Sequence, residues 1–128
     1  MNTLHGHLTY CSNIHPGTNW EEHFQILRDN VPTIKQQLSP DEPFALGLRI
    51  ANEGSYTLLE EKELFRFKEW LTAHNIYVFT MNGFPYGNFH GTQVKDQVHA
   101  PDWTTEERTS YTQRLFKILA EVLPDNLE

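Results

Sequence analysis

The sequence predicts an α/β fold in which three parallel strands alternate with three helices, in the order βαβαβα. Three short runs, 7–12, 44–51 and 76–82, have the alternating or continuous apolar composition of strands. Each run is followed by a stretch with helical apolar spacing that is long enough to form a crossover. Strands connected in this way form parallel sheets with right-handed crossovers, so we expect one small parallel sheet.

Length, charge and cysteine usage exclude several classes of protein. The 128 residues suffice for one domain, and 38% hydrophobic and 12% aromatic residues support a packed core. The net charge of −7, without a basic patch, argues against a nucleic-acid partner. Cys11 is the single cysteine, so no disulfide forms within the chain. The sequence shows no signal peptide and no apolar stretch of transmembrane length, so we expect a cytoplasmic protein that does not insert into membranes.

The first strand is predicted over residues 7–12 and the first helix over about residues 19–38. Thr18 and Glu21 have the spacing of a capping box, which indicates where this helix begins. Its apolar face carries residues at helical spacing: Trp20, Phe24 and Leu27. Pro32 supplies no amide hydrogen and is expected to kink or restart the helix.

The second strand, residues 44–51, has two different faces. One face carries large apolar side chains, as needed under a layer of helices: Phe44, Leu46, Leu48 and Ile50. The other face carries small side chains and one charge: Ala45, Gly47, Arg49 and Ala51. We expect a loop at residues 52–55 and a second helix over about residues 57–73.

The third strand, residues 76–82, leads into a long loop and then a third helix over about residues 105–122. Thr104 and Glu107 have capping-box spacing at the start of this helix. The loop has about twenty residues, and loops of this length in compact domains are usually functional or disordered. Its many aromatic and histidine residues favour an ordered, functional loop.

The polar residues of the strands are predicted to share one face of the sheet. Strict alternation places on this face His7, Thr9 and Cys11, then Ala45, Gly47, Arg49 and Ala51, then Ile76, Val78, Thr80 and Asn82. In a barrel this face would point into the lumen. The polar side chains at the carboxyl ends of the strands would then meet at the top of the barrel, where barrel enzymes have their active sites.

Arg49 is the most informative single residue of this face. An unpaired guanidinium buried among small side chains is costly. Arg49 is therefore expected either to hold a carboxylate, phosphate or substrate anion, or to lie at the strand end and pair with Glu53 or solvent. Asn82 precedes Gly83, and it either binds ligand or ends the strand by forming a turn.

The seven histidines suggest metal binding or acid–base chemistry. His5 and His7 have the spacing of some metal ligands, but no carboxylate completes a set in this segment, so hydrogen-bonded strand histidines are favoured. His90 suits general acid–base catalysis, with a structural loop histidine as the alternative. His15 follows the first strand and would lie at the same edge. Cys11 is expected to be a small core residue. Two helical histidines are interpreted as structural: His23 and His74.

Several segments resemble the N-terminal part of EboE-type metabolite traffic proteins, which belong to the xylose-isomerase-like TIM-barrel superfamily. The resemblance covers nearly all of residues 1–126. It is carried by residues 7–17, 43–49 and 77–91, and continues through Val94-Lys95, Val98 and residues 101–103. The block at residues 77–91 is the most specific of these.

This resemblance implies that the chain is the first three βα units of a longer, eight-stranded barrel. The barrel would bind or convert a small polar metabolite in an isomerase- or epimerase-like reaction, and residues absent from this segment would hold any divalent metal. Arg49 would hold an anionic group, Asn82 and His15 would orient polar groups, and His90 would act as acid or base. An apolar wall would be formed by Phe84, Tyr86 and Phe89.

Alternatives to this function and to this chain length remain open. The chain is either a piece of such a barrel or a non-catalytic metabolite-binding or handover module of a transport pathway. Residues 127–128, Leu-Glu, resemble a vector scar before a purification tag. As an isolated fragment with open strand edges, the chain is expected to be homo-oligomeric.

Overall fold

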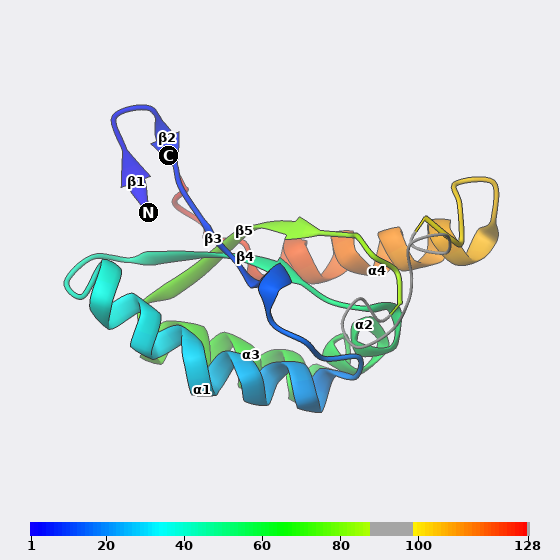
Figure 1. Cartoon of the computed structure of the whole chain (residues 1–128), viewed down its shortest axis with the longest axis horizontal. Coiled ribbons are helices and arrows are strands. Elements are labelled where there is room, and N and C mark those ends of the chain that lie inside the picture. Colours follow the sequence, from blue (N-terminus) through cyan, green and yellow to red (C-terminus); the bar gives the residue numbers. More distant parts are fainter. Residues whose placement is uncertain (88–98, 128) are drawn as a thin grey trace.

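The computed structural model describes residues 1–87 and 99–127 and confirms an α/β fold with a three-stranded parallel sheet (Figure 1). In chain order the elements are β1 (Asn2–Thr3), β2 (Gly6–His7), β3 (Tyr10–Cys11), the 3₁₀ helix η1 (Ser12–Ile14), α1 (Trp20–Leu38), β4 (Phe44–Arg49), α2 (Asn52–Leu58), α3 (Glu61–Ala73), β5 (Ile76–Asn82) and α4 (Glu106–Val122). The order β3-β4-β5 makes β4 the central strand.

The first strand is shorter than predicted, because residues 1–8 fold into a hairpin of their own. β1 and β2 pair antiparallel, and of the predicted strand 7–12 only the two residues of β3 pair with β4. The Met1 amino group donates hydrogen bonds to the Leu8 carbonyl at 2.7 Å and to the Tyr77 hydroxyl at 2.6 Å. These bonds attach the hairpin to β5.

Two helices begin one residue later than the predicted capping boxes imply. Asn19 caps α1, because its side-chain oxygen accepts a hydrogen bond from the Glu22 amide at 2.8 Å. Thr105 caps α4 in the same way, through its hydroxyl. α1 also contains Pro32 and continues past it as one helix, so the expected restart does not occur.

The loop predicted at residues 52–55 is wrong, because this stretch is the short helix α2. A glycine in a polar run usually indicates a turn, but Gly54 is buried where α2 meets α1. A Cβ atom at this position would lie 3.0 Å from the Ile50 Cγ2 and 3.3 Å from the Trp20 amide nitrogen. Gly54 therefore permits a close approach between α2 and α1.

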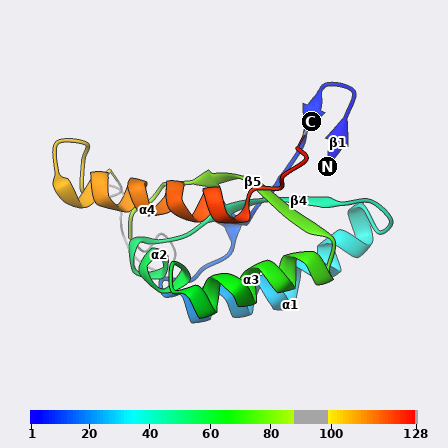
Figure 2. The same ribbon diagram turned by 180° about the vertical axis from the view of Figure 1, so that it is seen from behind.

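The hydrophobic core lies between the helices and one face of the sheet. Figures 1 and 2 show α1 and α3 side by side beneath the sheet and α4 along β5. The large apolar residues of β4 meet aromatic residues of α1 and α3, in which Trp20 stacks on Phe24 and meets Phe67 edge-on. The predicted inner face of β4 is thus confirmed, since Phe44, Leu46 and Leu48 are fully buried.

β5 departs from strict alternation, which changes the face that its first residues occupy. Ala45 pairs with Tyr77 and Gly47 with Thr80, so β5 contains one extra residue in this interval. Ile76 and Val78 consequently pack in the core, contrary to the prediction. Thr80 and Asn82, which pair with Gly47 and Arg49, share the opposite face with them as predicted.

Candidate functional site

A polar hollow of about 260 Å³ lies on the sheet face opposite the core, toward the carboxyl ends of the strands. Residues of all three parallel strands or their flanks line it: Thr9, Cys11, Gly47, Thr80, Met81 and Asn82. The absence of a side chain at Gly47 leaves this space open, since a Cβ atom there would lie 3.2 Å from the Thr9 hydroxyl oxygen. Hydroxyl and amide groups therefore converge on one small space.

Arg49 lies at the end of β4, beside the hollow, and is 1% exposed. Its Nη1 donates to the Gly17 carbonyl at 3.1 Å and its Nη2 to the Gly87 carbonyl at 2.5 Å. These carbonyls belong to the segments that follow β3 and β5. Glu53, one of the partners predicted for this side chain, forms no ion pair with it among the described residues. Burial lowers the pKa of Arg49, and its Nε has no hydrogen-bond partner in the described part of the chain.

His15 and Ser12 bring the segment after β3 to the same end of the sheet. The Ser12 hydroxyl accepts a hydrogen bond from the Arg49 amide at 2.9 Å, and Ser12 is completely buried. His15 is also buried, and its Nε2 lies 2.8 Å from the Tyr10 hydroxyl. The structure thus places His15 and Arg49 at one end of the sheet, as predicted.

His23, interpreted from the sequence as structural, belongs to this polar group. It lies near the start of α1, is 2% exposed, and neither ring nitrogen has a hydrogen-bond partner among the described residues. Burial and the nearby charges of Arg49 and His15 lower the pKa of His23 to about 4, although the Pro16 carbonyl partly opposes this shift. Its helical spacing from Trp20 and Leu27 was the signal that His23 lies on the buried face.

Tyr111 is a second residue that the sequence reasoning missed. It begins the buried stripe of α4, and its hydroxyl donates to the Ile50 carbonyl directly after β4. Burial raises the pKa of Tyr111 to about 12, despite the opposing charges of nearby arginines. Arg114, one turn further along α4, donates to the side chains of Ser55 and Asn52. α4 and α2 are thereby held against the end of β4.

The residues that follow β5 divide between different neighbours. The Asn82 side-chain oxygen accepts a hydrogen bond from the Phe84 amide at 3.1 Å, which is the predicted turn, while Asn82 also lines the hollow. Phe84 lies against His99, with ring centroids 5.3 Å apart. Tyr86 instead meets Tyr111 edge-on. Two predicted site residues, Phe89 and His90, lie outside the described residues.

The remaining predictions for histidine and cysteine have mixed outcomes. The Nδ1 of His7 lies 2.7 Å from the Tyr77 hydroxyl, so His7 is a hydrogen-bonded histidine, as favoured above. Cys11 is exposed rather than in the core, because it lies on the open face of the edge strand β3, and its thiol donates to Asn13. No group of three or more metal-ligating residues gathers within residues 1–87 and 99–127.

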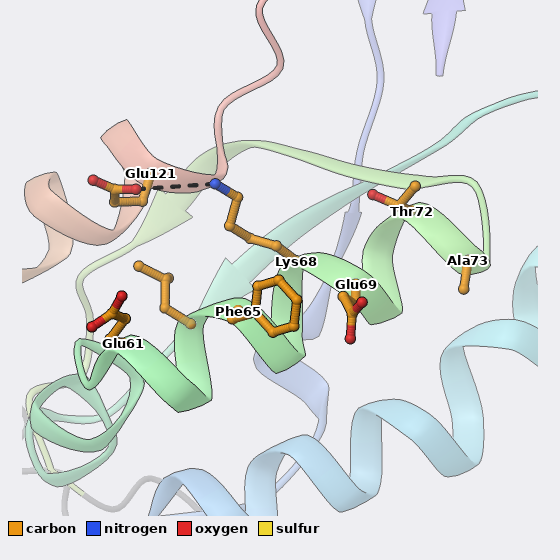
Figure 3. Close-up of a pocket in the computed structure, with 8 residues that line it drawn as sticks. Glu61, Phe65, Lys68, Glu69, Thr72, Ala73 and Glu121 are labelled. Carbon is orange, nitrogen blue, oxygen red and sulfur yellow. Dashed lines mark ion pairs between the residues drawn. The ribbon is translucent and has the colours of Figure 1, made fainter.

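A larger hollow, about 560 Å³, lies away from the strand ends, between α3 and α4 (Figure 3). Phe65 and Leu64 line it together with charged side chains, of which Lys68 and Glu121 approach to 4.0 Å. These charges lie on exposed helix faces, where an ion pair contributes little. The buried polar residues Arg49, His15 and His23 lie instead at the strand ends near the smaller hollow, which is therefore the candidate site.

Comparison with protein-family models, with curated proteins and with solved structures finds no match to this chain. Within its described residues, no helix is long and apolar enough to cross a membrane.

Proposed function

We propose that this chain binds a small polar metabolite in the hollow at the carboxyl ends of β3, β4 and β5. The observation that carries the proposal is a polar hollow with a buried arginine next to it, since Arg49 pairs with Asn82, which lines the hollow. Thr9, Thr80 and Asn82 offer hydroxyl and amide groups to ligand hydroxyls, and Arg49 offers a positive charge to an anionic group. Parallel α/β folds commonly bind ligands at this end of their strands.

We further propose that the chain is the first part of a xylose-isomerase-like barrel of the EboE type. Neighbouring strands follow chain order, and α1, α3 and α4 all contribute to the core on one face. A doubly wound sheet carries helices on both faces, whereas a barrel carries them all outside and leaves the inner face for the ligand. This arrangement supports the barrel.

In this proposal an isomerase- or epimerase-like conversion takes place only in a longer chain. His90 would act as acid or base there. Later strands would hold any divalent metal, since the described residues gather no ligand set of their own. Binding without conversion, as in a handover module, is the second candidate. It is favoured by the hydroxyl and amide groups of the hollow, which bind ligands but are poor proton-transfer groups.

The experiment is ligand-observed NMR with neutral sugars, sugar acids and sugar phosphates, on the wild type and on Thr80→Val. Thr80→Val keeps the shape of the side chain but removes one hydroxyl from the hollow. We expect affinity to fall about tenfold, as when one hydrogen bond to a bound ligand is lost.

Thr72→Val, at an exposed position of α3, is the matched control and should bind like the wild type. Equal affinity in Thr80→Val and the wild type, or no binding of any ligand class, would contradict the proposal. In a longer chain, turnover that a chelator abolishes would favour conversion over handover.

A further inference from the structure

Three buried nitrogen atoms at the end of β4 have no hydrogen-bond partner among the described residues. They are the Nε of Arg49 and the two ring nitrogens of His23, whose ring has the Pro16 carbonyl nearby but makes no well-formed hydrogen bond. Both side chains are at least 98% buried, so bulk water does not solvate these atoms. Leaving a buried polar atom without a partner is costly, and more so when the group is charged. Native proteins rarely keep several such atoms together without a ligand or an ordered water.

The backbone of Gly17 lies next to both residues, and the charge of Arg49 acts on the ring of His23. Arg49 donates to the Gly17 carbonyl, and a Cβ atom at Gly17 would lie 3.0 Å from the Cα of His23. Arg49 follows Gly47 by two residues on β4, so its side chain is on the same strand face as the hollow. Arg49 also pairs in register with Asn82, which lines the hollow, so Arg49 is next to the proposed metabolite site without lining it.

The chemistry of these atoms selects their ligand. The Arg49 Nε carries a hydrogen that can only be donated, and a neutral imidazole donates through one nitrogen. A cation would be repelled by the guanidinium. No described carboxylate forms an ion pair with Arg49, so its charge is without a counterion in this part of the chain. A group with several acceptor oxygens and a negative charge satisfies both donors at once.

We propose that Arg49 and His23 form an oxyanion subsite, which receives the carboxylate or phosphate group of a metabolite bound in the hollow. The inference rests on the proposed function and names the class of metabolite: a small polar compound with one oxyanion group. It also makes His23 a binding residue.

Anion binding at this subsite is linked to a proton. The groups that face His23 are the guanidinium of Arg49 from β4 and the imidazole of His15 after η1, and Tyr111 of α4 faces Arg49. Both groups that face the ring disfavour its protonation. A bound anion reverses this balance and raises the pKa of His23, so binding takes up a proton. Affinity for the anion therefore increases as the pH falls toward the pKa of the free protein, about 4.

The test is an NMR titration of the histidine side chains in the wild-type chain, without added anion, with inorganic phosphate and with acetate. We expect at least one anion to raise the pKa of His23 by about one unit or more, which corresponds to about tenfold tighter binding by the protonated ring. A shift with phosphate alone assigns a phosphate group, and a shift with acetate alone assigns a carboxylate. His74, exposed at the end of α3, is the internal control and should not respond.

A His23→Gln variant adds a second readout. At about pH 4 its affinity for the active anion should be about fivefold weaker than that of the wild type if the anion raises the pKa by one unit, with a smaller difference near neutral pH. His74→Gln should bind like the wild type. An unchanged pKa of His23 with both anions, or equal shifts at His23 and His74, would overturn the inference and assign the unpartnered atoms to buried water.

The two proposals fail separately. If Thr80→Val weakens metabolite binding while no anion changes the pKa of His23, the metabolite site stands and the oxyanion subsite falls. If phosphate or acetate shifts His23 but no metabolite binds, the subsite stands without the metabolite site.

Discussion

At the scale of single residues, the candidate site is defined by buried polar side chains that have few hydrogen-bond partners. When the chain folds, the Arg49 guanidinium loses its hydrating water and donates hydrogen bonds to two carbonyl groups instead. Hydrogen bonds from a charged donor contribute about 1.5–3 kcal/mol each to stability. Because Gly17 and Gly87 supply these carbonyls, the guanidinium joins the segments after β3 and β5 across the end of β4. Arg49 thereby holds these two segments together whether or not a ligand is bound.

The burial of His23 predicts a specific dependence of stability on pH. Its pKa falls from 6.5 to about 4 on folding, so the unfolded chain binds more protons between these values. This contribution to the free energy of unfolding is fully present above pH 6.5 and is lost as the pH falls toward 4. The difference of 6.5 − 4 = 2.5 units corresponds to roughly 3 kcal/mol.

Urea unfolding of His23→Leu measures this contribution. The variant has no imidazole to protonate, so between neutral pH and about pH 4 it should lose roughly 3 kcal/mol less stability than the wild type. His74→Leu, at an exposed position, should follow the wild type. Parallel pH profiles for His23→Leu and the wild type would show that His23 is not the buried, neutral group described above.

At the scale of secondary-structure elements, the packing of α2 against α1 depends on the close approach of their backbones at Gly54. The N-terminal turn of α1 presents Trp20 to the core, and α2 places Gly54 against the backbone of that residue. α4 holds α2 from the other side, through Arg114 and its hydrogen bonds to Asn52 and Ser55. This short helix is thus enclosed between two longer ones.

Gly54→Ala should destabilise the protein although alanine is the better helix former. The gain in helix propensity is at most about 1 kcal/mol, whereas overpacking costs about 1–3 kcal/mol. The new Cβ would lie 3.0 Å from the Ile50 side chain and 3.3 Å from the backbone of Trp20, which cannot move freely. We expect a net loss of about 1 kcal/mol in urea unfolding.

Gly87→Ala is the matched control, because among the described residues no atom beyond its chain neighbours lies within 4 Å of the Cβ position at Gly87. Its free energy of unfolding should be unchanged or slightly higher, since alanine restricts the unfolded chain. A Gly54→Ala variant more stable than the wild type would show that α1 and α2 separate without cost.

At the scale of the whole molecule, the three-stranded sheet has two edge strands that pair with no further strand among the described residues. β3 and β5 each pair with β4 only. Beside β5, a second groove of about 310 Å³ carries apolar side chains of β5, of α4 and of the segment before it, including Phe79, Met81, Trp103, Phe116 and Leu119. Open strand edges and apolar grooves favour association.

We expect the isolated chain to self-associate through this groove. Phe116 is 67% exposed and lies in the groove, so Phe116→Glu should raise the dissociation constant at least about tenfold in sedimentation equilibrium. Leu38→Glu alters an equally exposed apolar residue, at the end of α1, and should leave association unchanged. A wild-type chain that stays monomeric at high concentration would contradict the prediction.

The order of the strands and helices, and the inner face of β4, follow from the sequence alone. Periodicity in Phe44, Leu46 and Leu48 is a local signal, because burial on one side of a strand requires apolar side chains at alternate positions. The position of Arg49 near the end of that strand is equally local. Sequence therefore determined that a charged residue would lie at the end of β4, beside small residues.

Tertiary packing alone decided which groups surround that charge. The extra residue in β5 moves Ile76 and Val78 to the core. Packing against α1 accompanies helix formation in the stretch around Gly54. The same packing buries His23 beside Arg49. Each outcome depends on contacts between residues far apart in the chain. Local propensity contributes tenths of a kcal/mol per residue, whereas burial and close packing contribute about 1–3 kcal/mol per side chain and prevail where the two conflict.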